Sequence, residues 1–213
     1  MNLAPRPTPP PRIALLLKTP YPGAVKTRLA ATVGEEKALE IYRQLAELQV
    51  LALPAGWPVT IYFDPPEARE QMIQWLNPHR PGMNSVAQCA GDLGARLAAA
   101  FAEEFARGAA GVIAVGGDCP GLDEGVLCAA HRALTTVDVV LGPATDGGYY
   151  LIGLKQPRAD LFTGIAWGTP EVLAQTRARI AASALTSAEL PPLDDVDDEA
   201  GWRLTVEAGL LPP

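Results

Sequence analysis

RIALLLKTPYPGAVKTRLA, Arg12–Ala30, joins a short apolar run to a loop that contains three cations, two prolines and a glycine. The apolar run over Ile13–Leu17 has the length of a buried strand. A strand that ends in a basic, glycine-containing loop before a helix is typical of a site that holds an anion. This stretch therefore predicts both an α/β fold and an anionic ligand at the end of its first strand.

The loop itself carries the residue types that phosphate groups require. Gly23 permits a backbone geometry closed to other residues. Lys18 and Lys26 supply point charges and Arg28 a forked donor, which together suit a di- or triphosphate. The loop matches neither the GxxxxGK[ST] nor the GxGxxG pattern. A solvated basic turn is the alternative interpretation.

Strand-length apolar runs alternate with helical patterns along the rest of the chain. Strands are expected over residues 12–18, 58–63, 111–115, 137–141 and 184–190, with another after residue 148. Helices are expected over residues 34–53, 65–76, 92–107, 123–134 and 169–182, and at the end of the chain. This alternation predicts a three-layer α/β/α fold with a mostly parallel mixed sheet. No linker divides it, so we expect one domain over residues 12–213 behind a disordered or extended lead-in, residues 1–11.

Composition excludes several classes of protein. Seventeen Lys and Arg against 24 Asp and Glu give 17 − 24 = −7, which argues against non-specific nucleic-acid binding. Cys89, Cys119 and Cys128 form neither a disulfide framework nor a metal-ligand spacing, which fits a reducing cytoplasm. The longest apolar runs are far shorter than the roughly eighteen residues of a membrane span, so no membrane insertion is expected. The oligomeric state is not indicated.

The strand near residues 111–115 ends in a Gly-Gly-Asp turn. Gly117 lets the backbone pass close to a ligand, and the carboxylate of Asp118 can hold Mg²⁺ or Mn²⁺ on the phosphates. We therefore predict Asp118 as a metal ligand and catalytic residue. The alternative is that Asp118 caps the helix expected from Asp123, or satisfies the hydrogen bonds of the turn.

The stretch GPATDGGYYL, Gly142–Leu151, repeats this arrangement. Asp146 could bind a hydroxyl group or orient the nucleophile, while Gly147, Gly148 and Tyr149 lie beside a sugar or acceptor. The alternative is a common Asp-Gly turn between two strands.

The late stretch LDDVDDE packs several acidic residues together. If Asp195 and Asp197 alternate on an extended segment, they point the same way and can share a cation. The other interpretation is a solvated helix start, and the two are compatible, because Asp197 or Asp198 can cap the helix while Asp195 binds metal. An earlier stretch, Gln88–Leu97, could contact an anion through its backbone or simply begin a helix.

Six motifs in this order resemble the bacterial glycosyltransferase-like family labelled radical-SAM/selenodomain-associated transferase, in the nucleotide-diphospho-sugar transferase superfamily. They are KTPYPGAVKTRL, GDLGARL, GGDCPGL, GPATDGGYYLIGL, LFTGIAWGT and DVDDE, between residues 13 and 204. A more distant resemblance is to 2-phospholactate guanylyltransferase. The late motif departs from the family pattern, because Gly201 replaces its second acid.

The resemblance implies a GT-A type α/β fold with a nucleotide at the strand ends. It also implies roles for the residues above: phosphate contacts from Lys18, Lys26 and Arg28; metal ligation by Asp118 and by Asp195 or Asp197; and an acceptor facing Asp146, Gly147 and Gly148.

Three functions follow from the motifs and the resemblance together. The first is a divalent-metal-dependent transferase that uses a nucleotide sugar as donor and a small molecule as acceptor. The second is a nucleotidyltransferase that couples an NTP to a phosphorylated or carboxylated acceptor and releases pyrophosphate. The third is a nucleotide-binding module without turnover.

Overall fold

The computed structural model describes residues 9–212, so most of the lead-in expected over residues 1–11 lies outside the described part. Within it, the strands are β1 (Arg12–Lys18), β2 (Val59–Asp64), β3 (Asn84–Ala87), β4 (Val112–Val115), β5 (Val139–Pro143), β6 (Tyr149–Leu154) and β7 (Ser187–Glu189). The α-helices are α1 (Thr27–Val33), α2 (Glu35–Ala52), α3 (Arg69–Leu76), α4 (Leu93–Ala106), α5 (Glu124–Leu134), α6 (Val172–Ala182) and α7 (Glu199–Glu207). Two short 3₁₀ helices, η1 (Pro66–Ala68) and η2 (Ala159–Phe162), complete the set.

All seven strands form one mixed sheet in the order β3-β2-β1-β4-β6-β5-β7. Only β6 runs antiparallel to its neighbours β4 and β5; the other pairs are parallel. In the β1–β2 register Lys18 lies opposite Asp64, and in the β1–β4 register Leu15 lies opposite Val115. The carboxyl ends of β1, β2 and β4 therefore meet at one edge, and the predicted mostly parallel mixed sheet is confirmed.

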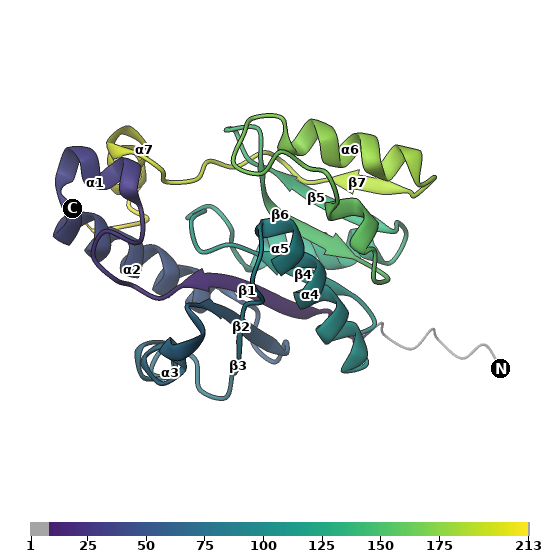
Figure 1. Cartoon of the computed structure of the whole chain (residues 1–213), viewed down its shortest axis with the longest axis horizontal. Coiled ribbons are helices and arrows are strands. Elements are labelled where there is room, and N and C mark those ends of the chain that lie inside the picture. Colours follow the sequence, from purple (N-terminus) through teal and green to yellow (C-terminus); the bar gives the residue numbers. More distant parts are fainter. Residues whose placement is uncertain (1–8, 213) are drawn as a thin grey trace.

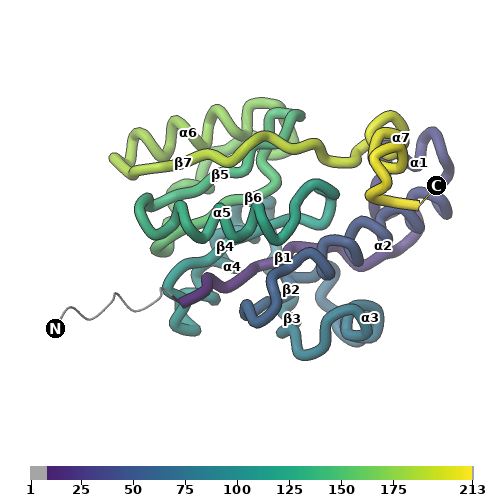
Figure 2. Tube along the Cα trace, turned by 180° about the vertical axis from the view of Figure 1, so that it is seen from behind, coloured from purple at the N-terminus to yellow at the C-terminus, as the bar shows by residue number. Residues whose placement is uncertain are grey.

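The sheet has a hydrophobic core on each face, because side chains alternate along its strands. In β1, Ile13 and Leu15 join a core with residues of α2, α3 and α5, whereas Ala14 joins a second core with residues of α4 and α6. Figure 1 shows α4 in front of the sheet, and Figure 2, seen from behind, shows α2 and α5 over the opposite face. This is the predicted three-layer arrangement.

A third cluster lies at the end of the molecule that holds the C-terminus. It joins α1, α2 and α7 around Leu29, Ile41 and Leu45. The segment of residues 190–198, which we call the strap, leads there from β7 across the strand ends (Figures 1 and 2). The strap is fixed on the way, because its Val196 packs in this cluster and donates its backbone N–H to the Asp118 carbonyl at 3.0 Å.

The structure corrects several expected elements. The helix expected over residues 65–76 is divided into η1 and α3. The helix expected from residue 169 begins only at Val172, because the residues before it form a loop packed on the turn at Asp146. Helix α1 and the edge strand β3 were not expected; both are short, and β3 has only one strongly strand-forming residue, Val86.

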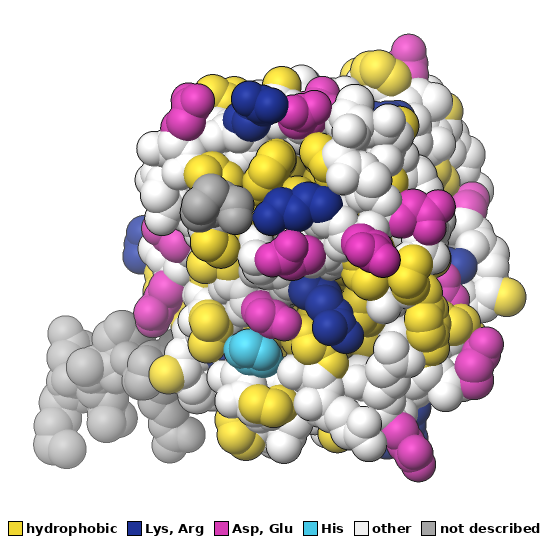
Figure 3. All heavy atoms as spheres, turned by 90° about the vertical axis from the view of Figure 1, so that its left-hand side faces the viewer, with side chains coloured by type: hydrophobic (Ala, Val, Ile, Leu, Met, Phe, Trp, Pro, Cys, Tyr) yellow, Lys and Arg dark blue, Asp and Glu magenta, His cyan; other side chains and the backbone are white. Residues whose placement is uncertain are grey.

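Two observations bear on the excluded classes of protein. None of the helices in residues 9–212 combines the length and the apolar character that crossing a bilayer requires. On the face seen in Figure 3, at the end that carries α1 and α7, basic and acidic side chains are interspersed. That face therefore offers no continuous basic surface of the kind that nucleic acids bind.

Candidate active site

A cavity of about 860 Å³ opens at the edge where the parallel strands end. The loop after β1, the turn after β4, the turn between β5 and β6, and the strap all contribute to its lining. In open α/β sheets, ligands bind outside the carboxyl ends of the strands. The convergence of strand ends expected from the sequence therefore creates a cavity large enough for a nucleotide-sized ligand.

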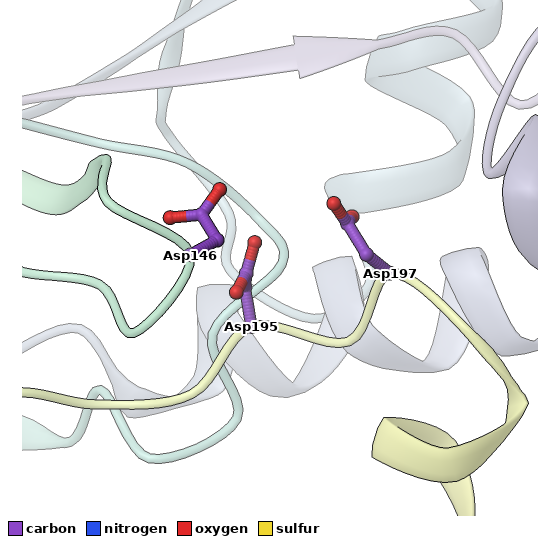
Figure 4. A group of neighbouring side chains, drawn as sticks. All are labelled: Asp146, Asp195 and Asp197. Atoms are coloured by element: carbon purple, nitrogen blue, oxygen red, sulfur yellow. The ribbon is translucent and has the colours of Figure 1, made fainter. Parts of the chain in front are cut away.

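Three carboxylates come together in this cavity. Asp146 lies on the turn between β5 and β6, and Asp195 and Asp197 lie on the strap, with ligand oxygens all within 4.8 Å of one another. Figure 4 shows the Asp195 and Asp197 side chains on the same side of the strap. The pair thus shares an orientation, as an extended segment with alternating side chains predicts.

Electrostatics in this group favours a bound cation. The pKa of Asp195 rises to about 6, first because the side chain is half-buried and second because the carboxylates of Asp146 and Asp197 repel its negative charge. Lys26 opposes this rise. An oxygen-only donor set with excess negative charge suits a hard divalent cation such as Mg²⁺ or Mn²⁺.

The basic loop after β1 reaches the same carboxylates. Lys26 has left-handed backbone dihedrals, φ 48° and ψ 45°, and precedes α1. Its Nζ lies 3.1 Å from Asp118 Oδ2 and 3.2 Å from Asp197 Oδ1, and its side chain is only 5% exposed. Arg28 Nη1 lies 3.4 Å from Asp197 Oδ2 and is largely exposed. Lys18 also lines the cavity, so all three predicted cations are brought together there.

Asp118 was predicted as a metal ligand, and that role stays a prediction. It lines the cavity and pairs with Lys26, but it is not part of the group of three close carboxylates. The alternative that it caps the following helix is wrong, because Asp123 caps α5 by accepting the N–H of Val126 at 2.8 Å. The cap of α7 is Asp198, which accepts the N–H of Gly201 at 2.9 Å.

The predicted site glycines divide into two groups. Gly117 and Gly148 line the cavity, and a Cβ at Gly117 would lie 2.5 Å from Leu17 Cδ2. Gly23 and Gly147 do not line it. Gly23 has a left-handed backbone conformation, and Gly147 packs so closely against Pro170 that a side chain would clash. These two glycines therefore meet the needs of the backbone at their turns.

Tyr149 follows the Asp146 turn and faces the loop before α6. Burial raises the pKa of its phenol, although the nearby Thr176 hydroxyl lowers it. The Tyr149 ring meets the Trp167 ring edge-on, with 6.3 Å between centroids. The turn is closed by Gly148, whose N–H donates to Asp146 Oδ1 at 2.8 Å. The Asp-Gly turn is therefore real and also carries one of the clustered carboxylates.

A polar network at the ends of β1 and β2 was missed. Gln88 donates to the carbonyls of Leu17 and Tyr62, at 3.1 and 2.7 Å. Arg96 donates to Asp64 Oδ2 and Gln88 Oε1, both at 3.0 Å. Asp64 ends β2 and Gln88 follows β3, so their positions at strand ends are a signal in the sequence. Their pairing with Arg96 of α4 depends on the tertiary structure. In the same stretch the helix-start alternative holds, because Asp92 accepts the N–H of Ala95 at 2.8 Å.

Comparison with known proteins agrees with this architecture. A family model described as "Uncharacterized protein conserved in bacteria (DUF2064)" matches residues 47–169. No curated protein matches the chain. A crystal structure from Desulfovibrio desulfuricans G20, described as a candidate nucleotide-diphospho-sugar transferase, is 34% identical with a TM-score of 0.82, covering 88% of this chain and 82% of that one.

More distant structures share the fold. The 4-diphosphocytidyl-2C-methyl-D-erythritol synthase of Anaerococcus prevotii DSM 20548 has a TM-score of 0.63 at 5% identity, covering 95% of this chain and 97% of its own. A Mycobacterium tuberculosis H37Rv protein, Rv0371C, solved in complex with manganese, has a TM-score of 0.54 at 15% identity, covering 93% and 99%. The chain thus has the fold of nucleotide-diphospho-sugar transferases and nucleotidyltransferases.

Proposed function

The chain belongs to this bacterial family, DUF2064, and we propose that it is an enzyme that transfers a group from a nucleotide-activated donor with the help of a divalent cation. One observation carries the proposal: three clustered carboxylates lie beside Lys26 and Arg28 in a single cavity at the strand ends. A nucleoside diphosphate group that binds with a metal ion needs both signs of charge side by side.

The residues divide this work between them. We assign the cation to Asp146, Asp195 and Asp197; when bound, it supplies positive charge that stabilises the departing diphosphate. The side chains of Lys18, Lys26 and Arg28 bind phosphate oxygens. For Asp118 we propose a positioning role instead of metal ligation, because it lies outside the group of three close carboxylates and pairs with the nearly buried Lys26 ammonium.

We infer that the donor is a nucleotide sugar, which the description of the Desulfovibrio desulfuricans relative supports. In this reaction an acceptor hydroxyl oxygen bonds to the anomeric carbon, and the bond from that carbon to the phosphate oxygen breaks. The nucleoside diphosphate leaves, and the hydroxyl proton passes to solvent. Catalysis rests on positioning and charge stabilisation, without a covalent intermediate.

Nucleotidyl transfer is the second candidate, because three cations after β1 also fit a triphosphate. In that reaction a phosphate or carboxylate oxygen of the acceptor bonds to the α-phosphorus of an NTP, and pyrophosphate leaves. For either reaction we propose a cytoplasmic location, since Cys89, Cys119 and Cys128 are free thiols.

The test is a thermal-shift screen of the purified protein against NTPs and nucleotide sugars, each with Mg²⁺, with Mn²⁺ and with EDTA. A ligand that binds only the folded state raises the melting temperature by mass action. We expect one nucleotide sugar to stabilise the protein only when the metal is present. Stabilisation by an NTP alone would favour nucleotidyl transfer. No shift with any of them at millimolar concentration would contradict the proposal.

Two variants locate the site in the same screen. Asp195→Asn removes one carboxylate of the cluster, so the metal-dependent shift should disappear. Asp194→Asn is the matched control, because it removes the same charge from the neighbouring residue. Asp194 is not part of the cluster, and its Oδ1 accepts a hydrogen bond from the Thr145 hydroxyl. Equal shifts in both variants would place the metal elsewhere.

A further inference from the structure

The cavity has two chemically different sides. One side holds the carboxylate cluster and the cations of the loop after β1. The other side consists of Leu93, Tyr149, Trp167, Pro170 and Val172, which we call the aromatic wall. The wall comes from the start of α4, from β6 and from the loop before α6. A charged donor accounts for the first side and leaves the second without an assigned ligand.

The loop of residues 163–171 is held in place by its own contacts. Leu173 donates its N–H to the Gly147 carbonyl at 2.9 Å, and a Cβ at Gly147 would lie only 2.3 Å from the Pro170 oxygen. The Ala166 N–H donates to Gln175 Oε1 at 2.7 Å. The wall is therefore preformed, which lowers the entropic cost of binding a ligand against it.

Trp167 has the largest side chain of this wall. Its ring packs edge-on against Tyr149, and its Nε1 lies toward Gly94, where an added Cβ would be 2.6 Å away. That nitrogen is buried and has no hydrogen-bond partner among the described residues. Leu93, at the start of α4, is 44% exposed. Because the indole nitrogen is turned into the protein, Trp167 offers the cavity apolar surface.

Positive charge in the cavity is directed away from the wall. Lys26 and Arg28 pair with the carboxylates of the cluster side. Arg96, the cation nearest the wall along α4, donates to Asp64, to Gln88 and to the Gly91 carbonyl. None of the described residues of the wall itself carries a positive charge, and Lys18, the remaining cation that lines the cavity, lies at the end of β1.

We propose that the aromatic wall binds the acceptor, and that the acceptor is an uncharged, hydroxyl-bearing molecule that lays the apolar face of a ring on Trp167. Tyr149 lies three residues after Asp146, so a ring on the wall has its hydroxyl groups near the carboxylate that faces the donor. This inference rests on the proposed transferase function. It assigns a role to LFTGIAWGT, which the sequence motifs alone left without one, and it excludes the charged acceptor of the nucleotidyl reaction.

The experiment compares two probes that differ by one phosphate: phenyl β-D-glucopyranoside and its 6-phosphate. Binding is measured by isothermal titration calorimetry in the presence of Mg²⁺ and the nucleoside diphosphate that corresponds to the nucleotide sugar with the largest thermal shift, so that the phosphate side is filled. We expect the uncharged probe to bind at least about tenfold more tightly, since a phosphate placed on the wall would lose water without gaining a partner.

Variants test the wall itself. Trp167→Ala should weaken binding of the uncharged probe at least about tenfold, and Trp167→Phe should restore most of it. Trp202→Ala, which removes an equal ring from α7, should leave it unchanged. Leu93→Lys places a cation on the exposed edge of the wall and should shift the preference about tenfold toward the 6-phosphate. This last variant keeps the proposal testable if Trp167→Ala does not fold.

Each result has a definite meaning. The proposal is overturned if the 6-phosphate binds the natural protein as tightly as the glucoside, or if Trp167→Ala and Leu93→Lys leave both affinities unchanged. If neither probe binds while the nucleotide still raises the melting temperature, the acceptor inference falls and the transferase proposal stands. If the nucleotide shift is also missing, both fall.

Discussion

Replacing Asp195 by asparagine should make the metal-free protein more stable at neutral pH, although it removes a residue we assign to the site. Asp195 is half-buried beside the carboxylates of Asp146 and Asp197, and its pKa rises from 3.8 to about 6. The folded protein therefore binds this proton more tightly than the unfolded chain. It follows that the free energy of unfolding falls as the pH rises from about 4 to about 6, and stays lowered above that range.

The size of the effect follows from the shift. Each pKa unit corresponds to about 1.4 kcal/mol, so a rise of about two units converts to about 3 kcal/mol. Because the side chain is only half-buried, screening by water reduces this value, and we expect about 1–2 kcal/mol. For a domain of this size that is a rise in melting temperature of about 3–6 °C for Asp195→Asn above pH 6.

The assay is thermal unfolding at intervals from pH 4 to pH 8 with EDTA present, for the natural protein, Asp195→Asn and the control Asp194→Asn. The gain should be small at pH 4, where Asp195 is protonated in the folded protein, and full above pH 6. Adding Mg²⁺ with the nucleotide should reverse the order, because only the natural protein gains from the ligand. A variant less stable than the natural protein at pH 7.5, or a gain that does not change with pH, would refute the electrostatic reasoning.

Three further predictions concern the basic loop, the Asp146 turn and a buried carboxylate of α4. Lys26→Met removes the cation between the two carboxylates and should weaken nucleotide binding about ten- to hundredfold in a titration followed by melting temperature; unchanged affinity would rule out its phosphate role. Gly147→Ala should lower the melting temperature by at least about 6 °C, because its Cβ would lie 2.3 Å from the Pro170 oxygen. Gly108→Ala, also at positive φ but with open space around it, should cost only about 2–4 °C, and equal losses would show that the loop is free to move. Glu104→Gln, at a fully buried carboxylate that accepts from two arginines and a tyrosine, should cost about 2–4 kcal/mol in denaturant unfolding while nucleotide affinity stays constant.

The elements that sequence predicted well are those whose own residues determine them. The strands β1, β4 and β6 are buried apolar runs, and α4 and α5 begin at aspartates that act as caps in the structure. Strand β3 and the late start of α6 depend on other parts of the chain: β3 exists through pairing with β2, and the residues before α6 pack on the Asp146 turn. A pattern within one segment contains no signal of such contacts.

The same distinction applies to the site. The sequence predicted acidic and basic residues at the strand ends, and all of the predicted charged residues line one cavity. That Asp146 joins Asp195 and Asp197 could not be predicted, because Asp146 and Asp195 come from segments almost fifty residues apart. Asp118 was a candidate by sequence because it follows a buried strand directly, and in the structure its carboxylate pairs with Lys26.

The strap shows how a local pattern can still determine part of a site. In Asp195-Val196-Asp197 the central valine is buried among residues of α1 and α2, and its backbone is bonded to Asp118. Because successive side chains of an extended segment point to opposite sides, burying the valine turns both acids toward the cavity (Figure 4). The hydrophobic contact thereby offsets part of the cost of holding like charges together. Val196→Ala should therefore loosen both carboxylates at once and reduce metal-dependent stabilisation, although the variant keeps every charged group of the site.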